Sequence, residues 1–398
     1  MALTSFTVSK LTVPGAANRQ DAVSRRGLLG LAAASAATTG LALGGCAQQA
    51  AGTLSAEVSA PFGERVAAYG ASQAGIDRPA IPQSQLELGV FDLADGVSPG
   101  AALAKLGSAV SDVASGRSPR LAGTEPGDLT VTIGVGPRLV AAVNPTLPGA
   151  MQLPSFAREQ IAASDRDGDV MVQVCGSDPL AVTLASGALA DAVHAAGGKE
   201  RWSQGGFRRY GGDGYALNLL GFRDGIVQPA PSELAAELWL DAPPQVAGAT
   251  IAVVRRLRID LPGFLGMPLA DQESAVGRHR ATGCPLSGGS VTTPLDLGAK
   301  TQEGGYVVPA TAHARRADPG VTGVGVMLRR GYNYVNGPED QGLLFIAFHR
   351  ELRTFTETQY QLDASDALME HTLATAGATF LILTGFGPDA PLGARLFS

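Results

Sequence analysis

Cysteine is scarce in this chain of 398 residues, which has only three and places none of them in a CxxC or CxxCH pattern. Thiolate metal sites and covalently attached c-type haem are therefore disfavoured. The patterns GxGxxG, GxxxxGK[ST], HExxH and GxSxG are also missing. Their absence argues against a Rossmann dinucleotide site, a P-loop, a zincin site and an α/β-hydrolase nucleophile.

Charged residues are also few, at 17%, whereas hydrophobic residues make up 45% and no run of like charges occurs. This balance is typical of a globular protein, and the length is sufficient for two domains. The net charge is −6. We expect no nucleic-acid partner, because an acidic chain lacks the basic patch that phosphates require.

The N-terminus carries a targeting pattern. Arg25 and Arg26 precede a mildly apolar Gly/Ala/Leu/Thr segment that ends at Cys46. This pattern predicts a twin-arginine signal peptide over residues 1–46, rather than a lasting membrane span, and export to the periplasm or extracytoplasmic face. The twin-arginine route carries folded proteins, commonly with a cofactor inserted. Leu43-Gly-Gly-Cys46 also resembles a lipobox, so Cys46 is either a lipid anchor or lies beside a simple cleavage site.

After the signal, the chain reads as a linker followed by two comparable halves. Residues 47–84 are rich in Ala, Gly, Ser and Gln and predict a linker. Residues 85–230 and 247–398 each show the order β-α-β-β-α-β, the ferredoxin-like unit. The predicted fold class is therefore α+β, with two ferredoxin-like domains, antiparallel sheets and helices on the outer faces.

An acid and a histidine are the local candidates for chemistry. Asp224 lies in GFRDG, at the seam between the halves, where three interpretations are open: a turn aspartate, a helix cap or a buried catalytic acid. His313 lies in PATAHARRADPG, where small neighbours would admit a flat macrocycle and Arg315 and Arg316 would suit its propionates. Structural interpretations are available for three other histidines, His194, His349 and His371, and His279 lies in the basic run GRHR, which suits anion binding.

Three motifs in the same order, GFRDG, AHARRADP and LRRGYNY, resemble the signature of dye-decolourising haem peroxidases. The twin-arginine start resembles that of the exported deferrochelatase/peroxidase subgroup. Supporting matches run through most of the chain after the signal, including TIGVGP, GDVMVQVCGSDP, RWSQGGF, GRHRATGCPL and TFLILTGFG. The resemblance implies paired ferredoxin-like domains, of which the C-terminal one holds one non-covalent haem b per chain.

The resemblance also implies roles for individual residues. His313 matches the axial ligand of the haem iron, Asp224 the distal acid and Arg329 the distal arginine, with Arg330 as the neighbour that could be confused with it. Glu370 is the first candidate, and Asp366 the second, for an acid that accepts the other ring proton of His313. The remaining matches are positions along the haem: Arg278 and Arg315 near the propionates, and Gly225, Ile226 and Val227 along the macrocycle.

The chain departs from the family pattern GxxDGTxNP at two positions. Ile226 replaces the threonine and Gln228 replaces the asparagine. The acid is retained, but the position of the loop that follows it is placed in doubt.

The expected function is reduction of hydrogen peroxide with oxidation of an aromatic or porphyrin reductant. Release of iron from haem for an iron-uptake membrane system is a subgroup inference, and a homodimer is a candidate assembly. One alternative is a non-catalytic haem-binding or iron-uptake accessory protein. Another is a haem-free solute-binding lipoprotein.

Overall fold

The computed structural model describes residues 63–397. The predicted signal peptide, the lipobox and the first part of the predicted linker lie outside them. The strands are β1 Gln85–Leu93, β2 Thr130–Val135, β3 Val170–Gly176, β4 Gly198–Phe207, β5 Arg209–Tyr210, β6 Ala216–Leu217, β7 Arg223–Asp224, β8 Thr250–Ile259, β9 Leu328–Arg329, β10 Tyr332–Gly337, β11 Asp340–His349 and β12 Thr372–Ile382. The helices are α1 Pro99–Ala114, α2 Pro137–Val143, α3 Pro179–Ala195, α4 Leu234–Leu238, α5 Leu261–Leu265, α6 Leu269–Val276, α7 His313–Arg316, α8 Pro319–Thr322 and α9 Leu352–Ser365, with short 3₁₀ helices η1 Pro119–Leu121, η2 Ala163–Asp165 and η3 Leu368–His371.

The two predicted β-α-β-β-α-β units are present. The first is β1-α1-β2-β3-α3-β4, and the second contains β8, α5 and α6, the hairpin β10–β11, α9 and β12. Ser98 and Asp178 cap the first turns of α1 and α3 with their side chains, and a proline follows each cap at a position that needs no backbone donor. The predicted α+β class with antiparallel pairing is confirmed.

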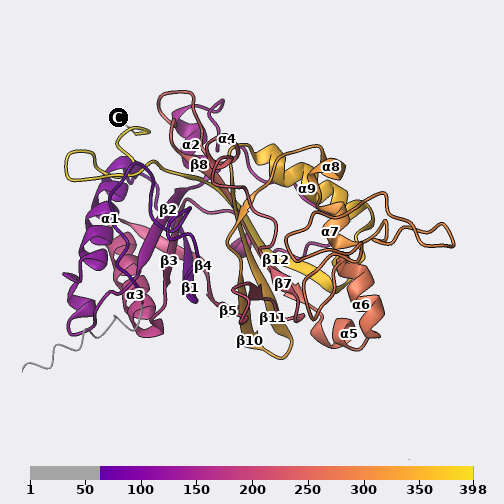
Figure 1. Cartoon of the computed structure of the whole chain (residues 1–398). Coiled ribbons are helices and arrows are strands. Elements are labelled where there is room, and N and C mark those ends of the chain that lie inside the picture. The colour runs from indigo at the N-terminus through magenta and orange to yellow at the C-terminus, as the bar shows by residue number, and fades with distance from the viewer. Residues whose placement is uncertain (1–62, 398) are drawn as a thin grey trace, which may run out of the picture. The chain divides into compact units, whose positions relative to one another are not determined.

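The two units share one sheet instead of forming two. Its nine strands run in the order β10-β4-β1-β3-β2-β12-β8-β11-β9, and β10 also pairs with β11, so that the sheet closes on itself. β9 pairs with the last residues of β11, in line with β10. The barrel interior is filled by apolar side chains from both halves, including Leu88, Val254, Ile346 and Phe380. Helices cover the outside, with α1 and α3 over the first half and α5 to α9 over the second (Figure 1).

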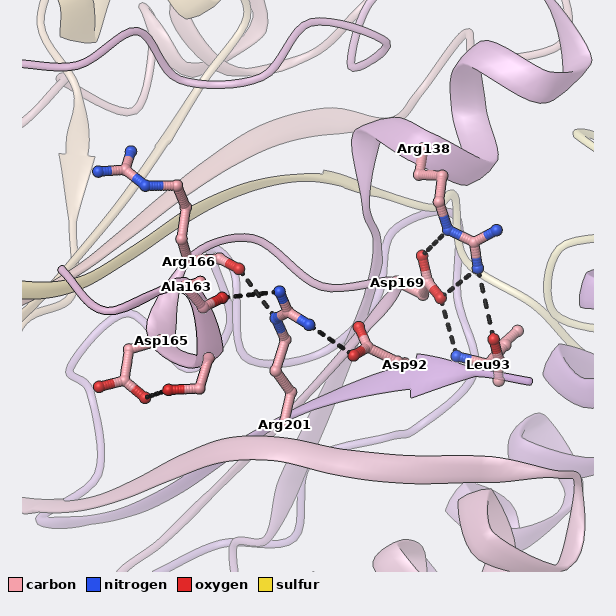
Figure 2. A network of polar contacts seen from close by, with 9 residues as sticks. Asp92, Leu93, Arg138, Ala163, Asp165, Arg166, Asp169 and Arg201 are labelled. Atoms are coloured by element: carbon pink, nitrogen blue, oxygen red, sulfur yellow. Dashed lines mark hydrogen bonds and ion pairs between the residues drawn. The ribbon is translucent and has the colours of Figure 1, made fainter. Parts of the chain in front are cut away.

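A polar network fixes the segment between α2 and β3 against the first half (Figure 2). Asp169 accepts hydrogen bonds from the Arg138 guanidinium and from the backbone N–H of Leu93, at 2.8 Å for the latter. Arg201 pairs with Asp92 at 2.6 Å and donates to the backbone oxygen of Arg166 at 2.9 Å. Hydrogen bonds of charged side chains therefore hold the segment between α2 and β3 against β1 and β4.

The predicted linker over residues 47–84 is wrong for its last part. Gln73 and Ile76 are fully buried, and the Gln73 amide donates to the backbone oxygens of Ile133 and Leu383, both at 2.9 Å. Gln83 is also buried and donates to Asp128. The polar composition of this segment predicts solvent exposure, but the amides of Gln73 and Gln83 donate hydrogen bonds to backbone oxygens inside the fold.

Residues 63–397 contain no candidate membrane-spanning helix and no disulfide bond. None of their helices combines the length and the apolar character needed to cross a membrane. The two described cysteines, Cys175 and Cys284, are free, and Cys175 is buried in the barrel, as expected for a small hydrophobic residue.

Candidate active site

His313 opens α7 and is held by a carboxylate from the end of α9. Its Nδ1 lies 2.6 Å from Oδ2 of Asp366, whose side chain is fully buried. Oδ1 of Asp366 accepts the backbone N–H of Leu368 at 2.8 Å, and the N–H of Ala367 donates to the oxygen of Thr311 at 2.9 Å. Both segments are thereby fixed. Because Nδ1 is engaged by Asp366, Nε2 is left as the ligand atom, and 37% of the side chain is accessible.

The acid beside His313 is therefore Asp366, and the choice of Glu370 is wrong. Glu370 is exposed in the 3₁₀ helix η3, one turn beyond the end of α9. The reason lies in the helix end: α9 stops at Ser365, and Asp366 leaves the helix with extended backbone angles. Its side chain consequently turns toward α7, whereas the following residues run along the surface.

The Asp366 carboxylate changes the proton affinity of His313. Burial pushes the pKa of the imidazole down, but the charge of Asp366 and its hydrogen bond outweigh this effect and leave the pKa raised. Arg329 lowers the same pKa and Asp224 raises it. Both charges therefore act on the His313 imidazole through space.

Asp224 lies at the end of the three-stranded sheet β5-β6-β7, opposite Ala216. Its Oδ1 accepts the backbone N–H of Gly225 at 2.6 Å, and Gly225 has a φ of +74°, a conformation that favours glycine. The turn interpretation of Asp224 is therefore correct as far as Oδ1 is concerned. Among the described residues Oδ2 has no hydrogen-bond partner, so a turn residue can also serve as an acid.

Arg329 ends β9 and Arg330 follows it, with its backbone N–H still bonded to the oxygen of Ile346, so their side chains point to opposite sides. Arg329 pairs with Ala347 of β11 on the outer face of the barrel, and its guanidinium has no hydrogen-bond partner among residues 63–397. Burial lowers the pKa of Arg329, and Asp224 opposes this effect. Arg330 is buried and donates to the backbone oxygen of Pro79. The structure thus separates the predicted distal arginine from its neighbour.

Gln228 joins the Asp224 loop to the strand of Arg329. Its Nε2 donates to the backbone oxygen of Arg329 and its Oε1 accepts the backbone N–H of Arg329, both at 2.9 Å. The replacement of the family asparagine therefore leaves the loop hydrogen bonded. Ile226 is half-buried and Val227 is 43% exposed along the same loop.

The two arginines expected near the propionates, Arg278 and Arg315, use some of their N–H groups to bond backbone oxygens of nearby loops. Arg278 is buried and donates to the oxygens of Gly283 and Val291, both at 3.0 Å. Arg315 donates to the oxygens of Val308 and Leu297 and lies 4.5 Å from the centre of the Tyr306 ring. An arginine has five donors, so contact with a carboxylate stays a prediction for both.

Arg208 was not predicted, although its charge acts on both Asp224 and Arg329. It donates to the backbone oxygen of Gly331 at 2.6 Å and to the hydroxyl of Tyr210 at 3.2 Å. It follows directly after β4, and no spacing in the sequence links it to β7 or β9. Only closure of the barrel by β10 brings the end of β4 to this place.

The residues present fit a haem. The donor set consists of one imidazole with a free Nε2, backed by a buried carboxylate, and an acid and an arginine whose charges act on that imidazole. Within residues 63–397 no group of three or more His, Cys, Asp or Glu side chains could hold a metal ion. A single imidazole backed by a carboxylate can hold a haem iron from one side.

Comparison with known proteins gives consistent results over both halves. The models for the Dyp-type peroxidase N-terminal and C-terminal regions match residues 73–208 and 215–386. A dye-decolorizing peroxidase of Thermobifida fusca is 33% identical over 68% of this chain and 67% of its own length, and a deferrochelatase of Escherichia coli is 29% identical over 85% and 88%. A DyP-type peroxidase from Streptomyces coelicolor superposes with a TM-score of 0.79 at 30% identity, covering 84% of this chain and 98% of that one. Ferric DtpA from Streptomyces lividans superposes with a TM-score of 0.78 at 29% identity, covering 84% and 97%.

Proposed function

Because the chain belongs to the Dyp-type peroxidase family, whose members are haem enzymes, we propose that it holds one non-covalent haem b through Nε2 of His313. The family reaction reduces hydrogen peroxide to water with electrons and protons from an organic reductant. The observation that carries the proposal is the His313–Asp366 pair at 2.6 Å, and the influence of the Asp224 and Arg329 charges on the same imidazole supports it. The bound haem would supply the electron-transfer chemistry.

Asp224 moves the proton. Hydrogen peroxide must lose a proton from one oxygen and gain one on the other before the O–O bond breaks, and a single carboxylate can do both. Oδ1 of Asp224 is held by the N–H of Gly225, so Oδ2 is the atom that accepts and returns the proton. The positive charge of Arg329 would stabilise negative charge on the peroxide.

A spectroscopic and kinetic comparison tests this function. We expect both site variants to keep the Soret band. Asp224→Asn should lose about 100- to 10,000-fold in kcat/KM for peroxide, the usual range for a proton-transfer group, and Arg329→Leu about 100- to 1,000-fold, the range for one electrostatic donor. Asp241→Asn is the matched control, because its carboxylate is exposed and pairs only with Arg350. Unchanged turnover in the two site variants would favour the non-catalytic haem-binding alternative. A colourless protein that shows no Soret band after haem addition would favour the solute-binding alternative.

Release of iron from haem is the second proposed activity, and the name deferrochelatase carried by several relatives supports it. Its products would be protoporphyrin and iron destined for a membrane uptake system. Incubation of the haem-loaded protein with a reductant and an iron(II) chelator tests it. Metal-free porphyrin fluorescence is the expected result, and haem recovered intact would contradict it.

Export by the twin-arginine route, with or without lipid on Cys46, is proposed from the sequence of residues 1–46 alone. Removal of this segment takes away a net charge of +3 and leaves −9, consistent with a protein that avoids nucleic acid. Replacing Arg25 and Arg26 by lysine should retain the protein inside the cell. Mass spectrometry of the exported form would show whether Cys46 carries lipid, and size-exclusion chromatography would test the proposed homodimer.

A further inference from the structure

A groove of about 280 Å³ lies on the outer face of the barrel, between the start of α3 and the edge formed by β4 and β10. The residues that line it come from four elements, among them Glu87 of β1, Val182 of α3, Gly205 of β4 and Val335 of β10. None of the residues assigned above to haem or peroxide lines this groove.

Two consecutive glycines in β4 form the floor of the groove. A side chain at Gly205 would place its Cβ 2.9 Å from Oε1 of Glu87, whereas one at Gly206 would point toward the barrel core, 2.8 Å from Cβ of buried Tyr332. The space above Glu87 therefore exists because position 205 has no side chain. Glycine in the interior of a strand weakens it and often marks a place that a ligand approaches.

Glu87 is the only acid that lines the groove, and among residues 63–397 it forms no hydrogen bond or ion pair through its carboxylate. Burial raises the pKa of this carboxyl, and no nearby charge counteracts the effect. A half-buried carboxylate without a partner is costly, and a bound cation would remove that cost.

The walls supply apolar surface and amides. Phe207 and Val335 are 37% and 53% exposed beside the glycine floor. The amides of Gln204 and Asn336 are already paired with each other, at 3.0 and 3.1 Å, which fixes one wall. The overall charge of −6 adds a long-range attraction for positive ligands.

From these features we infer that the groove is a binding site for a small aromatic cation, whose charged end pairs with Glu87 and whose ring lies between Phe207 and Val335. A planar amidinium fits a carboxylate through two parallel hydrogen bonds. The groove is smaller than most pockets for drug-sized molecules, which suits a single-ring ligand. The inference does not depend on the peroxidase function.

Calorimetric titration of the purified haem-loaded protein tests the inference, with benzamidine as the probe and the neutral isostere benzamide as the comparison. We expect benzamidine to bind at least about tenfold more tightly. Glu87→Gln should abolish this preference, because the variant keeps the shape of the side chain and removes its charge. Glu200→Gln, which alters an exposed acid elsewhere on β4, should leave the preference intact.

Two further readouts separate this site from others. Benzamidine should shift the backbone amide resonances of Gly205 and Gly206, and Gly205→Ala should weaken binding because the new Cβ would displace the Glu87 carboxylate. Glu87→Gln should melt no lower than the parent, since it loses no partner. Equal binding of the two probes, or a preference that persists in Glu87→Gln, would overturn the inference.

Discussion

His313 and Asp366 are separated by 53 positions in the chain, yet their side chains lie 2.6 Å apart and join the start of α7 to the end of α9. The carboxylate that polarises the imidazole is buried, so no water competes for it. Such an outer partner fixes the tautomer of a metal-binding histidine and raises its basicity.

Asp366→Asn should therefore weaken haem binding about 10- to 100-fold and raise the reduction potential of the iron, because a less basic imidazole stabilises ferric iron less well. Haem transfer to an acceptor protein and a potentiometric titration measure the two effects. Glu370→Gln is the matched control, since Glu370 is exposed and near in sequence. An equal effect of both variants would argue against a direct role of Asp366.

His313→Ala should abolish or severely weaken haem binding, with loss of the Soret band after gel filtration. The control is His279→Ala, because His279 is part-exposed and bonds only to Glu273, at 2.9 Å. Added imidazole should restore part of the band in the His313 variant. A normal Soret band in that variant without imidazole would remove His313 from the site.

Gln228→Leu should loosen the Asp224 loop, because it removes both hydrogen bonds to the backbone of Arg329. We expect a loss of about 1–3 kcal/mol in the free energy of unfolding, from two bonds at about 0.5–1.5 kcal/mol each. Amide exchange at Arg329 should become faster even without haem. The control Gln341→Leu removes a single bond to Pro338 in an exposed turn and should leave the exchange at Arg329 unchanged.

Glu159→Gln should destabilise the fold by about 3 kcal/mol or more, because it leaves Arg255 without its anionic partner in a buried position. Glu159 lies 2.6 Å from Arg255 and 3.1 Å from Arg166, and only 3% of the Arg255 side chain is exposed. Chemical denaturation of the haem-free protein gives the value. Asp191→Asn breaks the exposed pair with Arg120 and should cost less than about 1 kcal/mol.

The stability of the haem-free protein should fall on acidification through His349. Burial lowers the pKa of His349 to about 3, so the unfolded chain binds a proton near pH 6.5 that the folded protein refuses until about pH 3. The free energy of unfolding then decreases as pH falls through this window, by up to about 1.4 kcal/mol per pH unit. His349→Leu should flatten the slope between pH 6.5 and 5, whereas His194→Gln, at an exposed position, should not. Equal slopes in all three proteins would contradict this account.

Local patterns predicted the units of the fold but not how they join. The strand and helix order of both halves follows from hydrophobic periodicity. Closure of the barrel depends on β10 pairing with both β4 and β11, a contact between distant segments that leaves no local mark. The buried glutamines at positions 73 and 83 were misread as linker for the same reason.

In the candidate site, too, the motifs predicted some residues, whereas others depend on contacts between distant segments. The motif resemblance gave His313, Asp224 and Arg329, whose mutual influence the structure supports. It ranked Glu370 before Asp366, which is wrong, because the choice depends on the residue at which α9 ends. Gln228 looked like a loss of hydrogen bonding, since only the position of β9 reveals its partner.

Strand pairing between the two halves determines whether either half can fold as a separate fragment. Most strands of the shared barrel have a neighbour on each side, and β12 of the second half is joined to β2 of the first. A polypeptide cut near residue 210 would leave two fragments, each with unpaired strand edges and an uncovered apolar surface. Such fragments should aggregate when produced separately and recover solubility when produced together, so the two halves constitute a single cooperative folding unit.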